Sequence, residues 1–481
     1  MLRLTWVQPE DLLGHELRQA LLDGREPSRI AARWRAAGGL DAPERAGASP
    51  DRASRYLRLL AEDLLDELAD LPSTLADDEP ADLTGIRAAC PDWPAALTPA
   101  TAPHPGTADG TSAAPHACAE HTAAPSSART TPRALEAAWL GRAAGCLLGK
   151  PVEKLPLDAI RELARATGNW PLTTWFTAKG VPADLLARHP WNRRSAATSL
   201  AENIDGMPED DDLNYPLLNL LLLQRHGRAF TTDDVARLWL DELPPGRTFT
   251  AERVAHRNLL NGVEPPQTAR HRNPFREWIG ALIRADVHGW TNPGDPAAAA
   301  EQAYRDATLT HTGNGVYAAM FTAAVIAAAA TGTADVHACL RAGRAVVPAR
   351  SRLAGALGHA LELAYRHTDF DDVVDGLHAV YSATHHWVHA LPNTALTVAA
   401  LAHADGDFTG SVCRAVSGGW DTDSNGATAG SVAGLLAGSP DALPERWRAP
   451  LKNRLATSVA DFDGSGFDTL AHLTHLEATR P

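Results

Sequence analysis

The sequence predicts an all-α protein, and three observations lead to this expectation. Every strongly periodic segment after residue 133 repeats its apolar residues at helical spacing. Alternation of branched residues, which is typical of strands, is missing. Alanine-rich stretches such as residues 318–330 favour helices that pack closely. A chain of 481 residues and 51.1 kDa exceeds one ordinary core, so we expect more than one structural unit.

The first part of the chain, residues 1–96, contains short helical patterns separated by glycine and proline. One pattern runs over 28–37 and stops at two glycines. The longest covers 51–70, where leucines recur at helical spacing until Pro72 ends the pattern. We therefore expect a small helical accessory unit at 1–96.

Residues 97–132 consist almost entirely of Ala, Pro, Thr, His, Ser and Gly, with few side chains large enough to bury. This composition predicts a flexible linker. The main domain then spans 133–481. Its helices are expected at 135–148, 216–226, 233–240, 297–307, 316–330, 353–365, 393–404 and 428–437. We expect the polar motifs to lie in loops between these helices, where chemistry is common.

Charge and cysteine content exclude several classes of partner. The chain has 44 Lys and Arg against 58 Asp and Glu, and the net charge of −14 disfavours nucleic acid and anionic lipid. The five cysteines form no CxxC pair, which indicates neither a disulfide framework nor a zinc ribbon and favours a reducing compartment. The N-terminus MLRLTWVQPED has no apolar segment typical of a secretory signal. The apolar run 318–330 is too short to cross a membrane. We expect a cytoplasmic monomer without a nucleic-acid or membrane partner.

The motif GGWDTDSNGATAG, residues 418–430, offers ligands for a metal ion. Asp421, Asp423 and Ser424 supply three oxygen ligands within four residues, and hard divalent cations prefer such ligands. The spacing begins like a calcium-binding EF-hand loop, but the twelfth position is Val432 instead of Glu. Further carboxylates must therefore come from elsewhere in the chain.

A second acidic motif, PEDDDLNYPLLNLLLLQRHG, occupies residues 208–227. Its four acids precede an apolar helix, and acids there complement the helix dipole. One or two would suffice for that role, whereas four adjacent charges repel each other and favour a nearby cation. The acids at 233–234 fit an ordinary capping box that begins at Thr231, so we leave them out of the site.

Two further motifs contain candidate site residues. In GRAAGCLLGKPVE, residues 141–153, three glycines at helical spacing allow a helix or ligand to come close, and Glu153 either points into the same cavity or lies in solvent. In THTGNGVYAAMF, residues 310–321, His311 and Asn314 are candidate ligand contacts. The alternative for this second motif is a capped helix with a structural histidine.

Taken in order, the four motifs resemble those of the ADP-ribosylglycohydrolase family, whose members release ADP-ribose from modified side chains. The resemblance spans about 134–478. It implies an orthogonal all-α helical bundle with a central metal-binding cleft that holds two Mg²⁺ ions. It also implies hydrolysis at the anomeric carbon of the ribose.

The resemblance assigns roles to individual residues. The Thr-Asp-Asp of the family matches 209–211 and its Asp-x-Asp-Thr matches 421–424, so the implied Mg²⁺ ligands are Glu209, Asp210, Asp211, Asp421, Asp423 and Ser424. The implied catalytic residues are Glu153, which matches a mobile glutamate of the family, Asp211 and Asp423. The implied substrate contacts are His311, Gly313, Asn314, Gly419 and Trp420.

The sequence also departs from the family pattern. Cys146 stands where the family has Asp, and Glu209 replaces Thr. Trp420 is inserted before the second acidic motif, where its ring either stacks on a base or ribose or packs the loop.

The resemblance leaves three functions open. The first is hydrolysis of ADP-ribose from a protein side chain or a small acceptor. The second is release of an N-ribosyl or ADP-ribosyl group from a small NAD-derived metabolite, which a fence of Trp170, Trp175 and Trp191 around the cleft would favour. The third is a catalytically silent module that only binds ADP-ribose, but the intact Asp-x-Asp-Ser argues against it.

Overall fold

The computed structural model describes residues 3–94 and 130–480. In these ranges the chain is all-α, as the sequence predicts, and its only extended pairing consists of two isolated bridges. Of the expected linker, 97–129 lies outside the described residues, and a helix already begins at Pro132. Among the described helices, none is long and apolar enough to cross a membrane.

Two antiparallel helices form the centre of the molecule, α5 (Pro132–Gly149) and α20 (Thr422–Ala437). Their backbones touch, because a Cβ atom added to Gly145 would lie 1.9 Å from the carbonyl oxygen of Gly426. A Cβ added to Gly141 would lie 2.2 Å from the carbonyl oxygen of Gly430. The glycine spacing seen in the sequence therefore serves helix packing, which only residues without a side chain permit.

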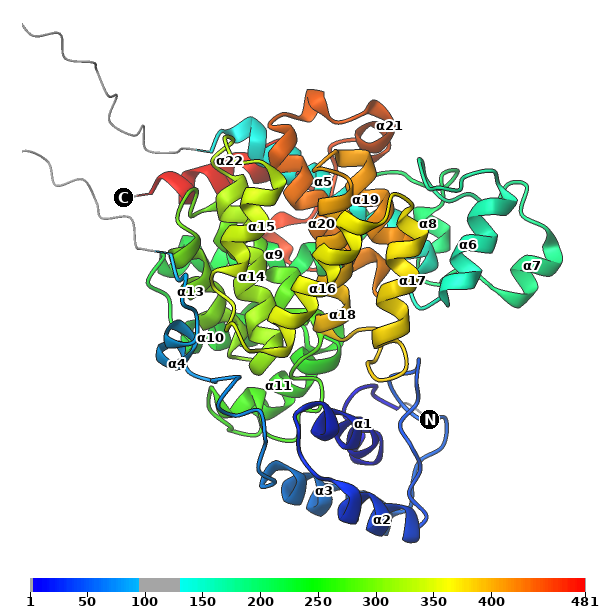
Figure 1. The fold of residues 1–481 in the computed structure, drawn as a ribbon, viewed down its shortest axis with the longest axis vertical. Helices are drawn as coiled ribbons and strands as arrows, with labels where there is room; N and C mark the ends of the chain where they lie inside the picture. Colours follow the sequence, from blue (N-terminus) through cyan, green and yellow to red (C-terminus); the bar gives the residue numbers. More distant parts are fainter. Residues whose placement is uncertain (1–2, 95–129, 481) are drawn as a thin grey trace, which may run out of the picture.

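Other helices enclose this pair (Figure 1). Those nearest to it are α9 (Asp211–His226), α14 (Gly313–Ala329), α18 (Ala390–His403), α19 (Phe408–Ser417) and α22 (Phe467–Thr479). The remaining helices of the main body are α6 (Leu157–Ala166), α7 (Ala183–Arg188), α8 (Ala196–Ser199), α10 (Thr232–Glu242), α11 (Thr250–Leu260), α12 (Asp286–Trp290), α13 (Pro296–Ala307), α15 (Val336–Arg344), α16 (Arg352–Arg366), α17 (Phe370–Tyr381) and α21 (Glu445–Arg448). The alanine-rich α14 is buried along nearly its whole length, which agrees with its expected close packing.

The acidic motifs lie on helix ends, so the expectation that they occupy loops is wrong for several residues. Asp210 is the N-cap of α9 and accepts a hydrogen bond from the backbone N–H of Asp212 at 3.0 Å. Asp421 precedes α20, and Asp423 lies in its first turn. The Asp210 carboxylate thus caps α9, and acids in the first turn of each helix complement its dipole, so each helix begins within its motif.

The N-terminal residues form four helices that pack against the main body, α1 (Pro9–Leu22), α2 (Ser28–Ala36), α3 (Arg55–Ala69) and α4 (Leu83–Ala88). Buried polar contacts hold this unit: Arg276 of the main body pairs with Glu16 at 2.6 Å and with Asp23 at 2.5 Å. The Trp6 ring packs edge-on against Phe275, with ring centroids 5.5 Å apart. The unit is therefore anchored to the main body by ion pairs and by aromatic packing.

The backbone contact between α5 and α20 predicts a stability effect. Gly145→Ala should lower the free energy of unfolding by about 1–3 kcal/mol, because the added methyl group forces two backbones apart. Denaturant unfolding followed by circular dichroism measures this change.

Gly358→Ala in α16 is the matched control, since a Cβ atom there meets nothing within 4 Å. That change should leave stability equal or raise it by up to about 1 kcal/mol through helix propensity. Equal effects of the two substitutions would contradict the close contact.

Candidate active site

A cavity of about 890 Å³ lies where α9 and α20 begin and α5 ends. The structure brings both acidic motifs and the third motif to this cavity, although they are far apart in the sequence. The predicted residues that line it are Glu153, Glu209, Asp210, Asp211, Asp421, Asp423 and Ser424.

Three of these acids form one group, which we call the open group: Glu153, Asp421 and Asp423. One carboxylate oxygen of each lies within 4.8 Å of the others. Asp421 and Asp423 are buried, and the partly buried Glu153 accepts a hydrogen bond from the amide nitrogen Nδ2 of Asn192 at 2.7 Å. The ammonium of Lys154 lies 2.8 Å from Glu153 and is 41% exposed. Glu153 is thus held in place at the cavity wall.

The open group carries more negative charge than its surroundings balance. Burial raises the pKa of Asp423 to about 7, and the charges of Glu153 and Asp210 add to this effect. Burial and the neighbouring Asp423 and Glu153 raise the pKa of Asp421 well above its usual value. Closely spaced buried carboxylate oxygens are suitable ligands for a hard divalent cation, whose charge would offset their repulsion. The residues present therefore fit a metal such as Mg²⁺.

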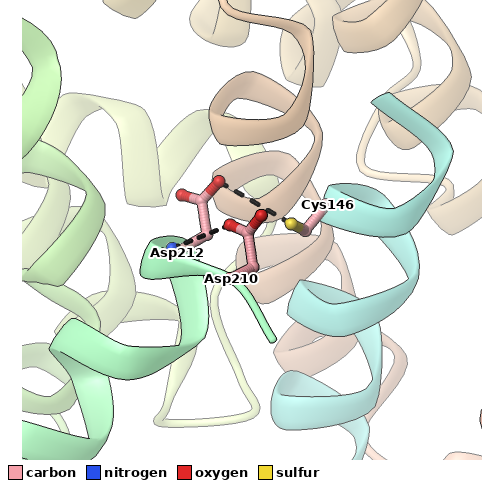
Figure 2. Close-up of side chains that lie close together, drawn as sticks. All are labelled: Cys146, Asp210 and Asp212. Carbon is pink, nitrogen blue, oxygen red and sulfur yellow. Dashed lines mark hydrogen bonds between the residues drawn. The ribbon is translucent and has the colours of Figure 1, made fainter. Parts of the chain in front are cut away.

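A second group contains Cys146, Asp210 and Asp212, with ligand atoms within 4.8 Å of one another (Figure 2). We call it the closed group, because a protein cation already occupies it. The ammonium of Lys150 forms a buried ion pair with Asp210. The thiol of Cys146 donates to the Asp212 carboxylate, with Sγ and Oδ2 3.7 Å apart.

Burial and nearby charges set the protonation of Lys150, Asp210 and Cys146, whereas burial and the Asp210 charge raise the pKa of Asp212 well above its usual value. Burial opposes the charge on Lys150, but the Asp210 carboxylate outweighs it and raises the pKa of Lys150 above its usual value. Burial alone would also raise the pKa of Asp210, yet the Lys150 ammonium holds that pKa below its ordinary value. Burial raises the pKa of Cys146 well above that of a free thiol. Lys150 is therefore charged and Cys146 is a neutral thiol.

The comparison with known protein families agrees with this geometry. A family model described as ADP-ribosylglycohydrolase matches residues 127–479. The chain belongs to the ADP-ribosylglycohydrolase family. This family consists of metal-dependent glycohydrolases, so membership supports a hydrolase whose buried acids are candidate metal ligands.

Two further comparisons are less informative about this member of the family. A search of curated proteins returned no match. A solved structure titled "ADP-ribosylglycohydrolase-related protein complex" is 21% identical, with a TM-score of 0.44. That match covers 72% of this chain and 99% of the other.

Two of the predicted acidic metal ligands, Asp211 and Glu209, belong to neither group. Asp211 lines the cavity, and burial together with the charges of Asp210 and Asp212 raises its pKa well above the usual value. Glu209 pairs with Arg247 at 2.9 Å and accepts a hydrogen bond from the hydroxyl of Ser458 at 2.5 Å. The carboxylate of Glu209 is thus already occupied by protein donors.

The predicted substrate contacts in the motif at 310–321 lie elsewhere in the fold. His311, Gly313 and Asn314 do not line the cavity that holds the acids. The amide of Asn314 donates to Glu277 at 2.9 Å, and its oxygen accepts from the backbone N–H of Leu353 at 2.9 Å. His311 is fully buried at the start of α14. These positions favour the structural interpretation of the motif.

The aromatic residues named from the sequence also lie outside the cavity lining. Trp420 stacks on His378 with ring centroids 4.1 Å apart, and the preceding Gly419 adopts a φ of +81°, so this pair packs the loop. Trp170, Trp175 and Trp191 are absent from the lining, so the fence of tryptophans that would favour a small-molecule substrate does not form.

Sequence reasoning missed the roles of several residues beside the acids. Arg142, Cys146 and Lys150 recur every four residues, a spacing that places side chains on one face of a helix. Arg142 is fully buried and lies 3.4 Å from Asp212 and 2.9 Å from Asp286. Two cationic residues, Arg142 and Lys150, at helical spacing in a glycine-rich segment could have indicated that this helix face meets the acids.

The excess negative charge of the open group predicts metal-dependent stability. Mg²⁺ should raise the melting temperature of the metal-free protein, since a ligand at one hundred times its Kd adds about 2.7 kcal/mol to stability. Differential scanning calorimetry with Mg²⁺ and with EDTA measures the shift.

Asp423→Asn should abolish the Mg²⁺-induced shift, because it removes one ligand of the open group. Asp461→Asn is the control, since Asp461 is an exposed acid in the short 3₁₀ helix Ala460–Phe462, distant in sequence from both groups. An unchanged Mg²⁺ response in Asp423→Asn would show that the open group does not hold the ion.

Proposed function

We propose that this chain is a divalent-metal-dependent hydrolase, with Mg²⁺ as its ion. It cleaves the glycosidic bond at the anomeric carbon of ADP-ribose attached to a protein side chain or a small acceptor. The observation that supports this most strongly is the convergence of Glu153, Asp421 and Asp423 on one cavity, from two segments far apart in the chain.

The open group would hold the ion, with the Ser424 hydroxyl beside it as a further oxygen ligand. A divalent cation there supplies charge that binds ribose hydroxyls and makes a water molecule more acidic. The protein orients this group through α18 as well, because the side-chain oxygen of Asn393 accepts a hydrogen bond from the backbone N–H of Asp421 at 3.1 Å. The backbone that carries Asp421 is thus fixed before any ligand arrives.

The acids of the cavity also act directly on the substrate. Cleavage at the anomeric carbon passes through a state with positive charge on the sugar ring, which an anionic cavity floor stabilises. Glu153 accepts the proton of the attacking water as general base. Asp211, whose pKa lies above its usual value, is protonated more readily and donates a proton to the leaving group.

Basic residues of the same cavity support an ADP-ribosyl substrate. Arg45, Arg193 and Arg194 line it, and none of them takes part in an ion pair among the described residues. Guanidinium groups suit the diphosphate of ADP-ribose, because they bind phosphate oxygens in pairs. A cavity of about 890 Å³ lies within the usual size range for ligands of this kind. Acids for the ribose and arginines for the diphosphate thus line one space.

A second candidate substrate is a small NAD-derived metabolite that carries an N-ribosyl or ADP-ribosyl group. One observation favours it: the N-terminal unit contributes Thr5, Trp6, Arg45 and Gly47 to the cavity wall. We infer that an acceptor enclosed by this wall is a small molecule rather than a protein surface.

The proposed role of the open group predicts loss of turnover on mutation. Asp421→Asn and Asp423→Asn should each lower kcat about 100-fold or more, because a metal ligand and part of the anionic floor are lost. Released ADP-ribose is measured with ADP-ribosylated arginine, ADP-ribosylated serine and small-molecule substrates, each with Mg²⁺ or EDTA.

Asp461→Asn should keep the activity of the unmodified protein. Full turnover in EDTA would contradict the metal dependence. Tight binding of ADP-ribose in calorimetry without turnover on any of these substrates would instead identify a silent binding module.

A further inference from the structure

The closed group differs from the open group in one feature, the Lys150 ammonium. Lys150 follows the last residue of α5, and its side chain is only 9% exposed. It lines the same cavity as the acids and pairs with Asp210, which is itself buried. A cation at this helix end is also favoured by the negative end of the α5 dipole.

The remaining members of the closed group are satisfied by protein donors. Asp212 lies 3.4 Å from Arg142 and accepts hydrogen bonds from the Ser424 hydroxyl and the Cys146 thiol. Asp210 accepts the backbone N–H of Asp212 in addition to its pairing with Lys150. Each carboxylate of this group therefore faces a fixed positive charge and at least one hydrogen-bond donor.

Cys146 also makes the closed group a poor site for a hard cation. Its sulfur is a soft ligand, whereas Mg²⁺ and Mn²⁺ prefer oxygen. It is moreover a donor in its hydrogen bond to Asp212, so its proton is in use. Beside the carboxylates of Asp210 and Asp212, the sequence thus places the thiol of Cys146 and the ammonium of Lys150. Neither group is an oxygen ligand.

The open group shows the opposite balance. Two ammonium groups act on its three carboxylates. That of Lys154 is 41% exposed and pairs with Glu153. That of Lys150 pairs with Asp210 and only partly offsets the rise in the pKa of Asp423. Among the hydrogen bonds of residues 3–94 and 130–480, no side-chain donor reaches the Asp421 carboxylate. A divalent cation is therefore needed in the open group but not in the closed group.

We propose that the Lys150 ammonium takes the place of a second metal ion, so that the cavity binds one divalent cation, in the open group. This inference rests on the metal dependence of the proposed function, and it replaces the two ions that the sequence resemblance implies. Lys150 acts as a fixed cation that keeps Asp210 from serving as a metal ligand. The Lys150 side chain thus supplies the positive charge that a second metal ion would otherwise supply.

The number of bound ions tests this inference without reference to activity. Mn²⁺ is the probe, because it takes oxygen ligands and is paramagnetic. Equilibrium dialysis of the full chain should give one Mn²⁺ per chain at saturation. Electron paramagnetic resonance should give the six-line signal of an isolated ion, because two ions about 3.5–4 Å apart would couple.

Lys150→Met is the decisive variant. It removes the ammonium and leaves Asp210 free, so it should bind two Mn²⁺ per chain and give a coupled signal. Lys150→Arg keeps the charge and should bind one. Lys452→Met removes a surface ammonium that pairs with Asp205, and it should also bind one.

The number of bound ions separates the role of Lys150 from the proposed function. Two ions in the unmodified chain would overturn the role of Lys150 but leave the proposed function intact, whereas no bound ion would overturn the proposed function itself. One ion in folded Lys150→Met would also overturn the role of Lys150. If Lys150→Met does not fold, Asp210→Asn provides the test. It should still bind one Mn²⁺ per chain. Loss of that ion would identify Asp210 as a metal ligand and would overturn the role of Lys150.

Discussion

The backbone contact between α5 and α20 is the constraint on which the site depends. Gly145 and Gly426 let the two helices touch without intervening side chains, and the hydroxyl of Thr422 donates to the carbonyl of Gly149 at 2.8 Å. This contact places the end of α5 directly beside the start of α20. Residues that follow α5 can then meet residues that begin α20, which is how Glu153 reaches Asp421.

Helix ends also explain how so many charges share one buried space. The positive ends of α9 and α20 face the cavity with acids in their first turns, and the negative end of α5 carries Lys150. Within this arrangement the charges divide unevenly. The closed group is balanced by the protein itself, whereas the open group keeps an excess of negative charge. That excess is the physical basis of the proposed metal binding.

Much of the fold follows from the sequence, because helical periodicity is a local property. The expected helices occur with shifted ends, and the acidic motifs begin α9 and α20 instead of preceding them. Long-range contacts carry no such local signal. The ion pair between Lys150 and Asp210 and the anchoring of the N-terminal unit by Arg276 join distant residues. The sequence alone allows Trp420 either to stack on a ligand or to pack the loop. Its stack on His378, a contact between distant residues, favours packing.

The central claim is that Glu153, Asp421 and Asp423 hold a divalent cation at the cavity floor. Anomalous diffraction from crystals soaked with Mn²⁺ tests it most directly, because the ion is located without reference to activity. We expect one strong peak within bonding distance of these three carboxylates. A saturated soak with no peak at these carboxylates, or with the ion bound by other residues, would contradict it.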